Sequence, residues 1–433
     1  ISIVVITGRA VVLVALGAVP LIFAPSITTA LFWVLAICVL AGIDALLAAS
    51  PRAVGISRQI HTPVRLSQTT RCELTLTNLN ARRLRGTVRD AWQPTANPRT
   101  ERHRVDIPSD ESRRVTTQLT PQRRGDLYAD RITIRTIGPL RIAGRQASIA
   151  VPGKLRVLPE FKARRHLPSK LTLLREMDGA AAVQVRGQGT EFDSLREYVP
   201  GDDVRSIDWR ATARRSEVVV RTWRPERDRR VLIVVDSSRT SAARVGDGAR
   251  LDASLEAALL LGALTSRAGD RVGLVAVDRK VRAQVPLNLG NNTLSTFADV
   301  LAPVYPQLVE VDWPYIAGLV TQQLSQRSLV VLLTALDPAA VQSGLLPVAT
   351  RLSRDHQVVV ASVADPELEE LRQKRGDAQD IFVASAAERV QLERAAMGRM
   401  LSQVGVEVVE AGPEDLAPKL ADTYLALKAA GRL

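Results

Sequence analysis

The sequence predicts a chain with an N-terminal transmembrane helical hairpin, a β-sandwich and a C-terminal α/β domain built on a doubly wound, mostly parallel sheet. Three observations support this architecture. Residues 1–50 are almost entirely apolar, residues 56–160 contain short runs of alternating polar and apolar residues, and residues 231–433 alternate strand and helix patterns. Residues 161–230 connect the last two parts. A length of 433 residues suits about two to four folded units.

The first 50 residues predict two membrane spans. Residues 27–49 form a run of 23 residues whose one charge is Asp44, and a helix of this length crosses a bilayer core of about 30 Å. The preceding residues 1–23 are apolar except for Arg9. A second apolar segment follows them instead of a polar mature sequence, which argues against a cleaved signal peptide. A buried core hairpin is the alternative. Because the chain starts with Ile1, we expect two spans as a minimum.

The distribution of charge predicts the orientation of the chain in a cell membrane, either an inner or a plasma membrane. The loop between the two apolar runs carries no charge, whereas Arg9 flanks the first run and four arginines follow the second: Arg52, Arg58, Arg65 and Arg71. By the positive-inside rule, we expect the soluble domains to lie in the cytoplasm beside the lipid bilayer.

The middle of the chain predicts strands of an antiparallel sheet at residues 72–78, 113–120, 130–138 and 154–159. Residues 51–230 carry 37 basic and 20 acidic side chains, whereas residues 231–433 carry 20 and 24. The basic surface is interpreted as a solvated arginine-rich face, with attraction to anionic lipid headgroups as an alternative. Aromatic side chains that stack on bases are scarce there, so no specific nucleic-acid partner is expected.

Residues 190–223 are the part of the sequence densest in charged and aromatic side chains. Pro200 and Gly201 predict a turn, after which Asp202 or Asp203 is expected to cap a helix with three residues on its apolar face, Val204, Ile207 and Ala211. Residues 216–223 predict a strand. We expect Trp209 to be buried and to anchor this helix to the α/β domain.

Five acidic residues in this segment leave three hypotheses open. Their neighbours are five arginines, Arg196, Arg205, Arg210, Arg214 and Arg215. The acids are Glu191, Asp193, Asp202, Asp203 and Asp208. They form an ion-pair network with the arginines, a docking surface for a partner, or the catalytic carboxylates of a metal-dependent hydrolase.

The same segment resembles the signature of the family named domain of unknown function 58 (DUF58). That signature has the form F-D-x-x-R-x-Y-x-x-G-D-x-x-R-x-I-D-W and precedes a von Willebrand factor A-like domain. The residues that carry the resemblance are Phe192, Asp193, Arg196, Tyr198, Gly201, Asp202, Arg205, Ile207, Asp208 and Trp209. The family's layout of two spans, a β-rich segment, this motif and an A-like domain covers essentially the whole chain. The resemblance implies partnership with a MoxR-type AAA+ ATPase, which acts like a chaperone on client proteins.

The C-terminal part predicts buried strands alternating with helices. Strands are expected at residues 231–235, 271–277, 328–334, 357–363 and 406–410, and two of the helices at 251–269 and 386–405. Such an alternation is typical of a parallel sheet with helices on both faces, in which ligands bind at the carboxyl ends of the strands.

The first of these strands ends in a loop whose oxygen-bearing side chains suit Mg²⁺. Asp236, Ser238 and Thr240 stand at alternate positions and offer a carboxylate and two hydroxyls. The loop resembles the metal-ion-dependent adhesion site (MIDAS) of A-like domains, which implies two further ligands, Thr293 and Asp337. Arg239 inside the loop, Thr240 in place of the usual Ser, and the late position of Asp337 depart from that pattern. The alternative is a loop that caps the following helix without a metal.

Sequence signatures of catalysis are missing. The chain contains no P-loop motif G-x-x-x-x-G-K-[ST] and no G-x-S-x-G elbow, so no catalytic residue is expected. The prediction is a membrane-anchored adaptor that binds a partner protein. A Mg²⁺ ion in the adhesion-type loop would leave one coordination position for a partner's carboxylate.

Overall fold

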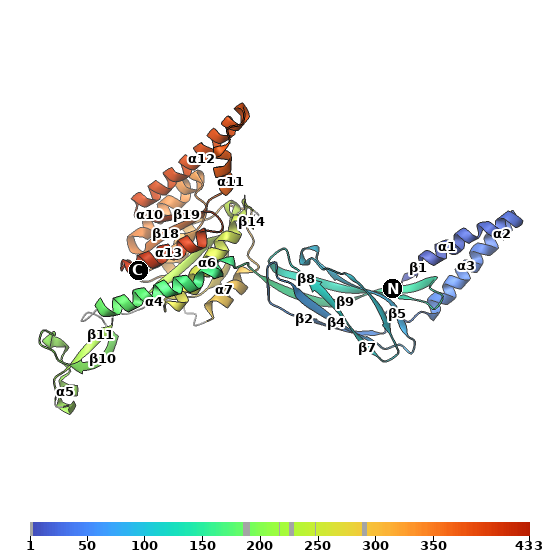
Figure 1. Ribbon diagram of the computed structural model, residues 1–433, viewed down its shortest axis with the longest axis horizontal. Helices are drawn as coiled ribbons and strands as arrows, with labels where there is room; N and C mark the ends of the chain where they lie inside the picture. The colour runs from blue at the N-terminus through green and yellow to red at the C-terminus, as the bar shows by residue number, and fades with distance from the viewer. Residues whose placement is uncertain (1–2, 185–190, 216, 225–228, 247, 288–291) are drawn as a thin grey trace. The chain divides into compact units, whose positions relative to one another are not determined.

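The chain is a mixed α/β protein with several sheets and one long apolar N-terminal helix. The computed structural model describes residues 3–184, 191–215, 217–224, 229–246, 248–287 and 292–433 (Figure 1). The chain divides into two compact units, Ile1–Leu158 and Pro159–Leu433. Each unit has its own sheets.

The apolar N-terminal residues form one helix of membrane-spanning length. Among the described residues, α3 (Ile27–Leu47) is the helix long and apolar enough to cross a bilayer, with a mean hydropathy of 2.5. The expected first span is shorter than predicted, because Ile3–Ile6 form strand β1 instead and pair with strand β9. The following helices α1 (Gly8–Leu16) and α2 (Ala18–Phe23) together extend about 24 Å, short of a bilayer core of about 30 Å.

The short helices pack against α3 through a tryptophan. The indole Nε1 of Trp33 donates a hydrogen bond to the carbonyl oxygen of Leu13 at 3.1 Å. The same ring covers Gly17, where an added Cβ would lie only 2.4 Å from the Trp33 side chain. A glycine is therefore required at the junction of α1 and α2.

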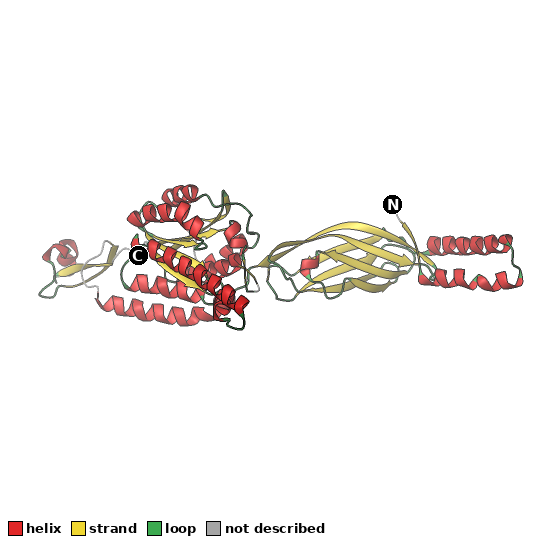
Figure 2. Cartoon of the chain, turned by 90° about the horizontal axis from the view of Figure 1, so that it is seen from above, coloured by secondary structure: helices red, strands yellow, loops and turns green. Residues whose placement is uncertain are grey.

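The remainder of the first unit consists of two packed sheets, antiparallel except where β3 pairs with β9 in parallel (Figure 2). One sheet has three strands in the order β2-β4-β7, and the other has six, in the order β1-β9-β8-β5-β6 with β3 paired to β9. The strands predicted at 72–78, 113–120, 130–138 and 154–159 are confirmed as parts of β4, β7, β8 and β9, although the last three runs each extend one residue past the end of the strand. The bounds are β2 Val54–Ile60, β3 Val64–Arg65, β4 Thr70–Asn78, β5 Leu84–Trp92, β6 Arg102–Ile107, β7 Ser112–Leu119, β8 Gly125–Ile137 and β9 Ala143–Leu158, with a 3₁₀ turn η1 at Pro94–Ala96.

A buried ion pair links the two sheets through their shared apolar core. Arg58 of β2 donates to Asp90 of β5 at 2.7 Å, and both side chains are buried. Asp90 also accepts hydrogen bonds from the indole of Trp92 at 2.8 Å and from the thiol of Cys72 at 3.6 Å. Burial in this core, followed by the negative charge of Asp90, raises the pKa of the Cys72 thiol to about 12. Cys72 is therefore a protonated core residue.

The second unit is organised around a six-stranded sheet in the order β16-β15-β12-β17-β18-β19. All neighbours are parallel except β16, which pairs antiparallel with β15 at one edge. All five strands predicted for this unit are confirmed. The bounds are β12 Arg230–Asp236, β15 Arg271–Val277, β16 Val281–Val285, β17 Leu329–Leu333, β18 Gln357–Val363 and β19 Glu407–Ala411, with a two-stranded ribbon of β13 (Arg244–Val245) and β14 (Gly248–Ala249).

Helices cover both faces of this sheet (Figure 2), as expected for buried parallel strands. Helices α6, α7 and α13 contact one face, and α8, η5, α10 and α12 bury apolar side chains against alternate residues on the other, such as Leu232 and Val234. The bounds are η2 Lys162–His166, α4 Leu167–Gln184, η4 Arg239–Ala242, α6 Arg250–Arg267, α7 Thr293–Leu301, α8 Trp313–Gln323, α9 Pro338–Ala340, η5 Val341–Leu345, α10 Leu346–Asp355, α11 Pro366–Gln373, α12 Ala378–Gln403 and α13 Leu416–Ala429.

The strand order reverses at β12. From β12 the chain passes through α6 to β15 on one side, and later returns as β17 on the other side. In open α/β sheets, the carboxyl ends of the strands beside such a switch point form a crevice that commonly binds ligands. The residues that follow β12 and β17 are therefore candidates for a functional site.

The signature segment forms a hairpin of β10 (Glu191–Glu197) and β11 (Val219–Arg224) with two short helical turns between the strands. The predicted continuous helix over 204–211 is wrong. A 3₁₀ turn η3 (Val204–Ser206) ends at Ile207, which makes a β-bridge with Val220, and helix α5 (Trp209–Arg215) starts afterwards. The bridge uses extended backbone at Ile207, so the helix cannot run through it.

Candidate functional site

The carboxylate of Asp236 organises the carboxyl end of β12. Its side chain is only 2% exposed. Asp236 Oδ1 accepts a hydrogen bond from the backbone nitrogen of Ser238 at 2.8 Å. Asp236 Oδ2 accepts from the hydroxyls of Thr240 at 3.1 Å and Thr334 at 2.7 Å. A loop after one strand and a residue after its parallel neighbour thus meet at one carboxylate.

The hydroxyls of the loop bond to each other and to the backbone. The oxygens of Ser238 and Thr240 lie 3.1 Å apart, and Ser241 donates to the carbonyl oxygen of Asp236 at 2.6 Å. The three predicted loop residues Asp236, Ser238 and Thr240 are therefore brought together. Thr334 was missed by the sequence analysis, although its position directly after an apolar strand beside β12 is the signal that could have identified it.

Thr293 is not brought to this cluster. Its hydroxyl donates to Ser266 at 3.1 Å, in the last turn of α6. Arg250, the first residue of α6, donates to the carbonyl of Thr240 at 2.9 Å. The sixteen helical steps from Arg250 to Ser266 extend about 24 Å along the helix, so Thr293 lies near the opposite end of α6 from Asp236. Residues 290–291, which precede Thr293 in the G-N-N-T run expected to supply this ligand, lie outside the described residues.

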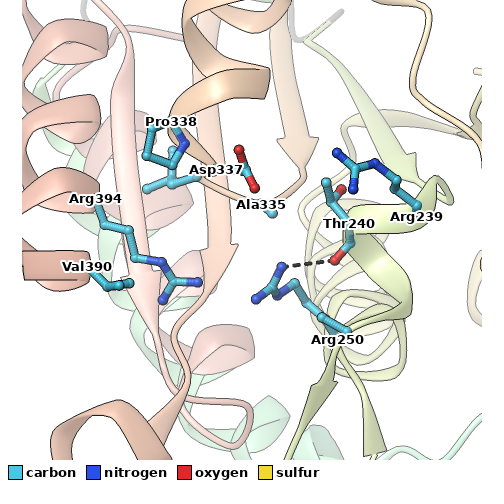
Figure 3. A pocket seen from close by; sticks show the side chains of 10 residues that line it. Arg239, Thr240, Arg250, Ala335, Asp337, Pro338, Val390 and Arg394 are labelled. Carbon is cyan, nitrogen blue, oxygen red and sulfur yellow. Dashed lines mark hydrogen bonds between the residues drawn. The ribbon is translucent and has the colours of Figure 1, made fainter. Parts of the chain in front are cut away.

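Asp337 lies beside the cluster but has another role. Its Oδ1 accepts hydrogen bonds from the backbone nitrogens of Ala339 at 3.0 Å and Ala340 at 3.4 Å, which caps α9. Asp337 also lines a cavity of about 350 Å³. The other residues around this cavity (Figure 3) are Arg239, Thr240, Ala243, Arg250, Ala335, Leu336, Pro338, Val390 and Arg394.

These residues do not fit the predicted five-ligand Mg²⁺ site. Three of the five, Asp236, Ser238 and Thr240, lie together and offer hard oxygen atoms. Thr293 is elsewhere, and the guanidinium groups of Arg250 and Arg394 line the same cavity, where their positive charges oppose a divalent cation. The described part of the chain also contains no group of three or more His, Cys, Asp or Glu side chains arranged to hold a metal.

The loop arginine that departs from the adhesion-type pattern is turned outward. The Arg239 side chain forms an ion pair with Glu310, and its backbone nitrogen donates to the carbonyl of Val309 at 2.9 Å. Both charged side chains are more than half exposed. Arg239 therefore contributes to the rim of the cavity, whereas Arg250 and Arg394 supply the charge inside it.

The acids of the signature segment are held by arginines and backbone nitrogens. Arg196 donates both Nη atoms to Asp202 at 2.8 and 2.5 Å, and Asp202 also accepts from the backbone of Val199. Asp208 accepts from the backbone of Arg210 and Ala211 and from Arg221 Nε at 2.8 Å, and the Ala211 N–H and then Arg221 lower its pKa. Asp203 caps the 3₁₀ turn by accepting from Arg205 N.

Other residues of the signature have different surroundings. Gly201 adopts φ of +110°, a conformation that suits glycine in this turn. Trp209 is 68% exposed, so the prediction that it is a buried anchor is wrong. Asp208 caps α5 directly before Trp209 and leaves the indole at the exposed start of the helix. The side chains of Phe192 and Asp193 lie outside the described part of the chain.

Comparisons with curated proteins identify relatives in mycobacteria. The "Uncharacterized protein Rv1480" of Mycobacterium tuberculosis and the "Uncharacterized protein Mb1516" of Mycobacterium bovis are each 28% identical to this chain over 209 residues. The match covers 47% of this chain and 65% of each relative. This chain therefore spans slightly less than two thirds of the length of these relatives.

Comparisons with solved structures give low overall similarity. An aerotolerance-related membrane protein from Bacteroides fragilis matches with a TM-score of 0.30 and 15% identity, over 46% of this chain and 98% of that protein. The CARDB domain of the PF1109 protein from Pyrococcus furiosus matches with a TM-score of 0.18 and 13% identity, over 24% of this chain and 91% of that domain.

The cavity and the sequence signature from Arg196 onward fall within one recognised region. The family described as "Protein of unknown function DUF58" matches this chain over residues 194–398, a range that contains Asp236, Arg250, Asp337 and Arg394.

Proposed function

We propose that the chain is a membrane-anchored adaptor of the DUF58 type. Its C-terminal unit has a von Willebrand A-like fold and binds a MoxR-type AAA+ ATPase during chaperone-like assembly or maturation of client complexes. The observation that carries this proposal is the cavity at the carboxyl ends of β12 and β17, which is the position where open α/β sheets bind ligands. The resemblance of the signature segment to the family supplies the class of partner.

The anchor follows from the apolar N-terminus. Helix α3 exposes large apolar side chains along its length, among them Leu31, Phe32 and Leu35, which lipid tails would cover. Arginines follow the helix in the sequence and flank its end, where the Arg82 Nη1 donates to the carbonyl of Leu46 at 2.9 Å. By the positive-inside rule, this basic end faces the cytoplasm, the compartment in which an AAA+ ATPase finds its nucleotide.

The rival function, hydrolysis by the acids of residues 191–208, has less support. Asp202, Asp203 and Asp208 each accept hydrogen bonds from backbone nitrogens, and two of them also form ion pairs with Arg196 and Arg221. A general base needs a carboxylate that is free to take a proton, and the Ala211 N–H and Arg221 hold the pKa of Asp208 below its usual value. These contacts suit a structural network.

Two measurements test the adaptor proposal. A reporter fused after Leu433 should be active on the cytoplasmic side, and the tagged full chain, solubilised from membranes, should co-purify with a MoxR-type ATPase identified by mass spectrometry. A reporter on the opposite side of the membrane would overturn the orientation and the partnership together. Turnover of a hydrolase substrate by the purified chain, lost in Asp208→Asn, would favour the rival function.

A further inference from the structure

The cavity at the carboxyl edge of the sheet contains two inward-pointing arginines. Arg250 begins α6 and Arg394 lies on α12, so helices from both faces of the sheet contribute to it. Figure 3 shows the two guanidinium groups pointing toward each other into the cavity, with Asp337 above them in this view. The Arg394 side chain is only 14% exposed. Two like charges thus face each other in a partly desolvated space.

The side chains of these arginines make few hydrogen bonds to the described residues. The Arg250 side chain makes one, from Nη1 to the carbonyl of Thr240, and its buried Nε makes none. The Arg394 side chain forms an ion pair with Glu410, in which Nη1 and Oε1 are 3.7 Å apart, too far for a hydrogen bond. Buried guanidinium donors are normally satisfied, so the Nε of Arg250 has room for a further acceptor such as an anion or a water molecule.

The electrostatic surroundings favour an anion in the cavity. Burial lowers the pKa of the Arg250 guanidinium, and the positive charge of Arg394 lowers it further, because each arginine opposes the charge of the other. Glu410 balances part of the charge of Arg394, with 3.7 Å between its Oε1 and Arg394 Nη1. Asp236 accepts three hydrogen bonds, and one oxygen of Asp337 caps α9. An anion between the two guanidinium groups would relieve their repulsion and accept their free N–H groups.

We propose that Arg250 and Arg394 bind the carboxylate of an acidic side chain presented by a protein partner, without a metal ion. A guanidinium matches a carboxylate through paired N–H···O bonds. The Thr240 hydroxyl lies beside them, and Val390, Leu336 and Pro338 form an apolar wall that suits the methylene groups of a Glu or Asp side chain. A phosphate dianion carries more negative charge, which Asp337 would repel, and it has no methylene groups to contact this wall.

This inference deepens the proposed function, because the same cavity would receive the acidic residue of the partner. It replaces the expected route, in which a Mg²⁺ ion binds the carboxylate, by direct recognition through arginine. Calorimetric titration of the full chain in detergent tests it without any ATPase. The probes are an alanine-rich peptide with one Glu, the same peptide with Gln, and inorganic phosphate.

We expect the Glu peptide to bind in the presence of a chelator and the Gln peptide to bind at least roughly tenfold more weakly. Arg250→Gln and Arg394→Gln should each weaken binding of the Glu peptide by roughly tenfold or more. Arg399→Gln removes a positive charge from an exposed position of the same helix α12 and should leave binding unchanged. Equal binding of both peptides, or tighter binding of phosphate than of the Glu peptide, would overturn the inference.

A variant that binds the Glu peptide more tightly cannot be explained by misfolding, so it complements the variants that lose binding. Asp337→Asn removes a negative charge beside the arginines, and Asn caps a helix about as well as Asp. We expect this variant to bind the Glu peptide more tightly, whereas a metal-bridged carboxylate would be bound more weakly. Weaker binding would therefore contradict the inference. Peptide binding without ATPase binding would uphold the arginine site and reject only the proposed partner.

Discussion

The carboxylate of Asp44 accepts a hydrogen bond from the backbone nitrogen of Ile142, with 2.8 Å between Oδ2 and the nitrogen. The same carboxylate accepts from the backbone nitrogens of Leu140 at 2.8 Å and Ala143 at 2.9 Å. Asp44 is fully buried in the last turn of α3, and the three donors lie in the turn before and at the start of β9. The one acidic residue in the apolar run therefore ties α3 to the sandwich.

Removing this carboxylate should destabilise the first unit. Asp44→Ala leaves three backbone donors without their charged acceptor, and we expect a loss of about 2 kcal/mol or more in the free energy of unfolding. Denaturant unfolding of the full chain in detergent measures it, with the exposed Asp130→Ala as the control. If the two variants unfold alike, the hydrogen bonds of Asp44 do not hold the helix end.

The buried thiol of Cys72 should make stability fall at alkaline pH. Its pKa is about 12 in the folded protein and 9.0 for an ordinary thiol, so the folded state holds the proton more tightly. The contribution is present below pH 9 and is lost between pH 9 and 12, at about 1.4 kcal/mol per pH unit. The measurement is the free energy of unfolding against pH for the parent and for Cys72→Ala, and we expect the parent alone to show this additional slope. Identical slopes in both proteins would show that the thiol titrates normally.

Two tryptophans should respond differently to truncation. Trp209 is 68% exposed, so Trp209→Ala should change the free energy of unfolding by less than about 0.5 kcal/mol. Trp92 is 6% exposed and bonds to Asp90, so Trp92→Ala should cost about 3 to 5 kcal/mol. Thermal melting of both variants beside the parent is the measurement. A large loss for Trp209→Ala would restore its role as an anchor.

Periodicity predicted the strands of both units because each strand buries a regular face or lies wholly inside. The run 231–235 lies within β12 and the run 271–277 coincides with β15. The length of the first predicted span was overestimated because its first residues have no periodic pattern. Hydropathy cannot distinguish an apolar strand from an apolar helix, and Ile3–Ile6 pair with β9, a partner more than a hundred residues away.

The site was predictable in part. Asp236, Ser238 and Thr240 are close in sequence, so one loop brings them together. Arg250 and Arg394, which line the cavity, come from the start of α6 and the middle of α12. The sequence around them gives no sign that these two positions lie close together. Long-range placement of charged residues depends on the packing of helices and is not encoded in local spacing.

The cation site of the adhesion-type pattern can be tested directly. Because the cavity contains Arg250 and Arg394, and Thr293 is bonded elsewhere, we expect no saturable heat when the full chain is titrated with Mg²⁺ or Mn²⁺ at millimolar concentration. Asp236→Asn should behave like the parent in this titration. Saturable binding to the parent that is lost in Asp236→Asn would establish a metal site and contradict the assignment of the cavity to anions.

The proposed docking of the AAA+ partner in the arginine cavity can be measured directly. The most direct measurement is the Kd between the detergent-solubilised full chain and the purified MoxR-type ATPase of the same organism, for the parent, Arg250→Gln and Arg399→Gln. We expect the parent and Arg399→Gln to bind with equal affinity, and Arg250→Gln to bind roughly tenfold more weakly. Absence of binding by the parent, or equal affinity in all three proteins, would contradict it.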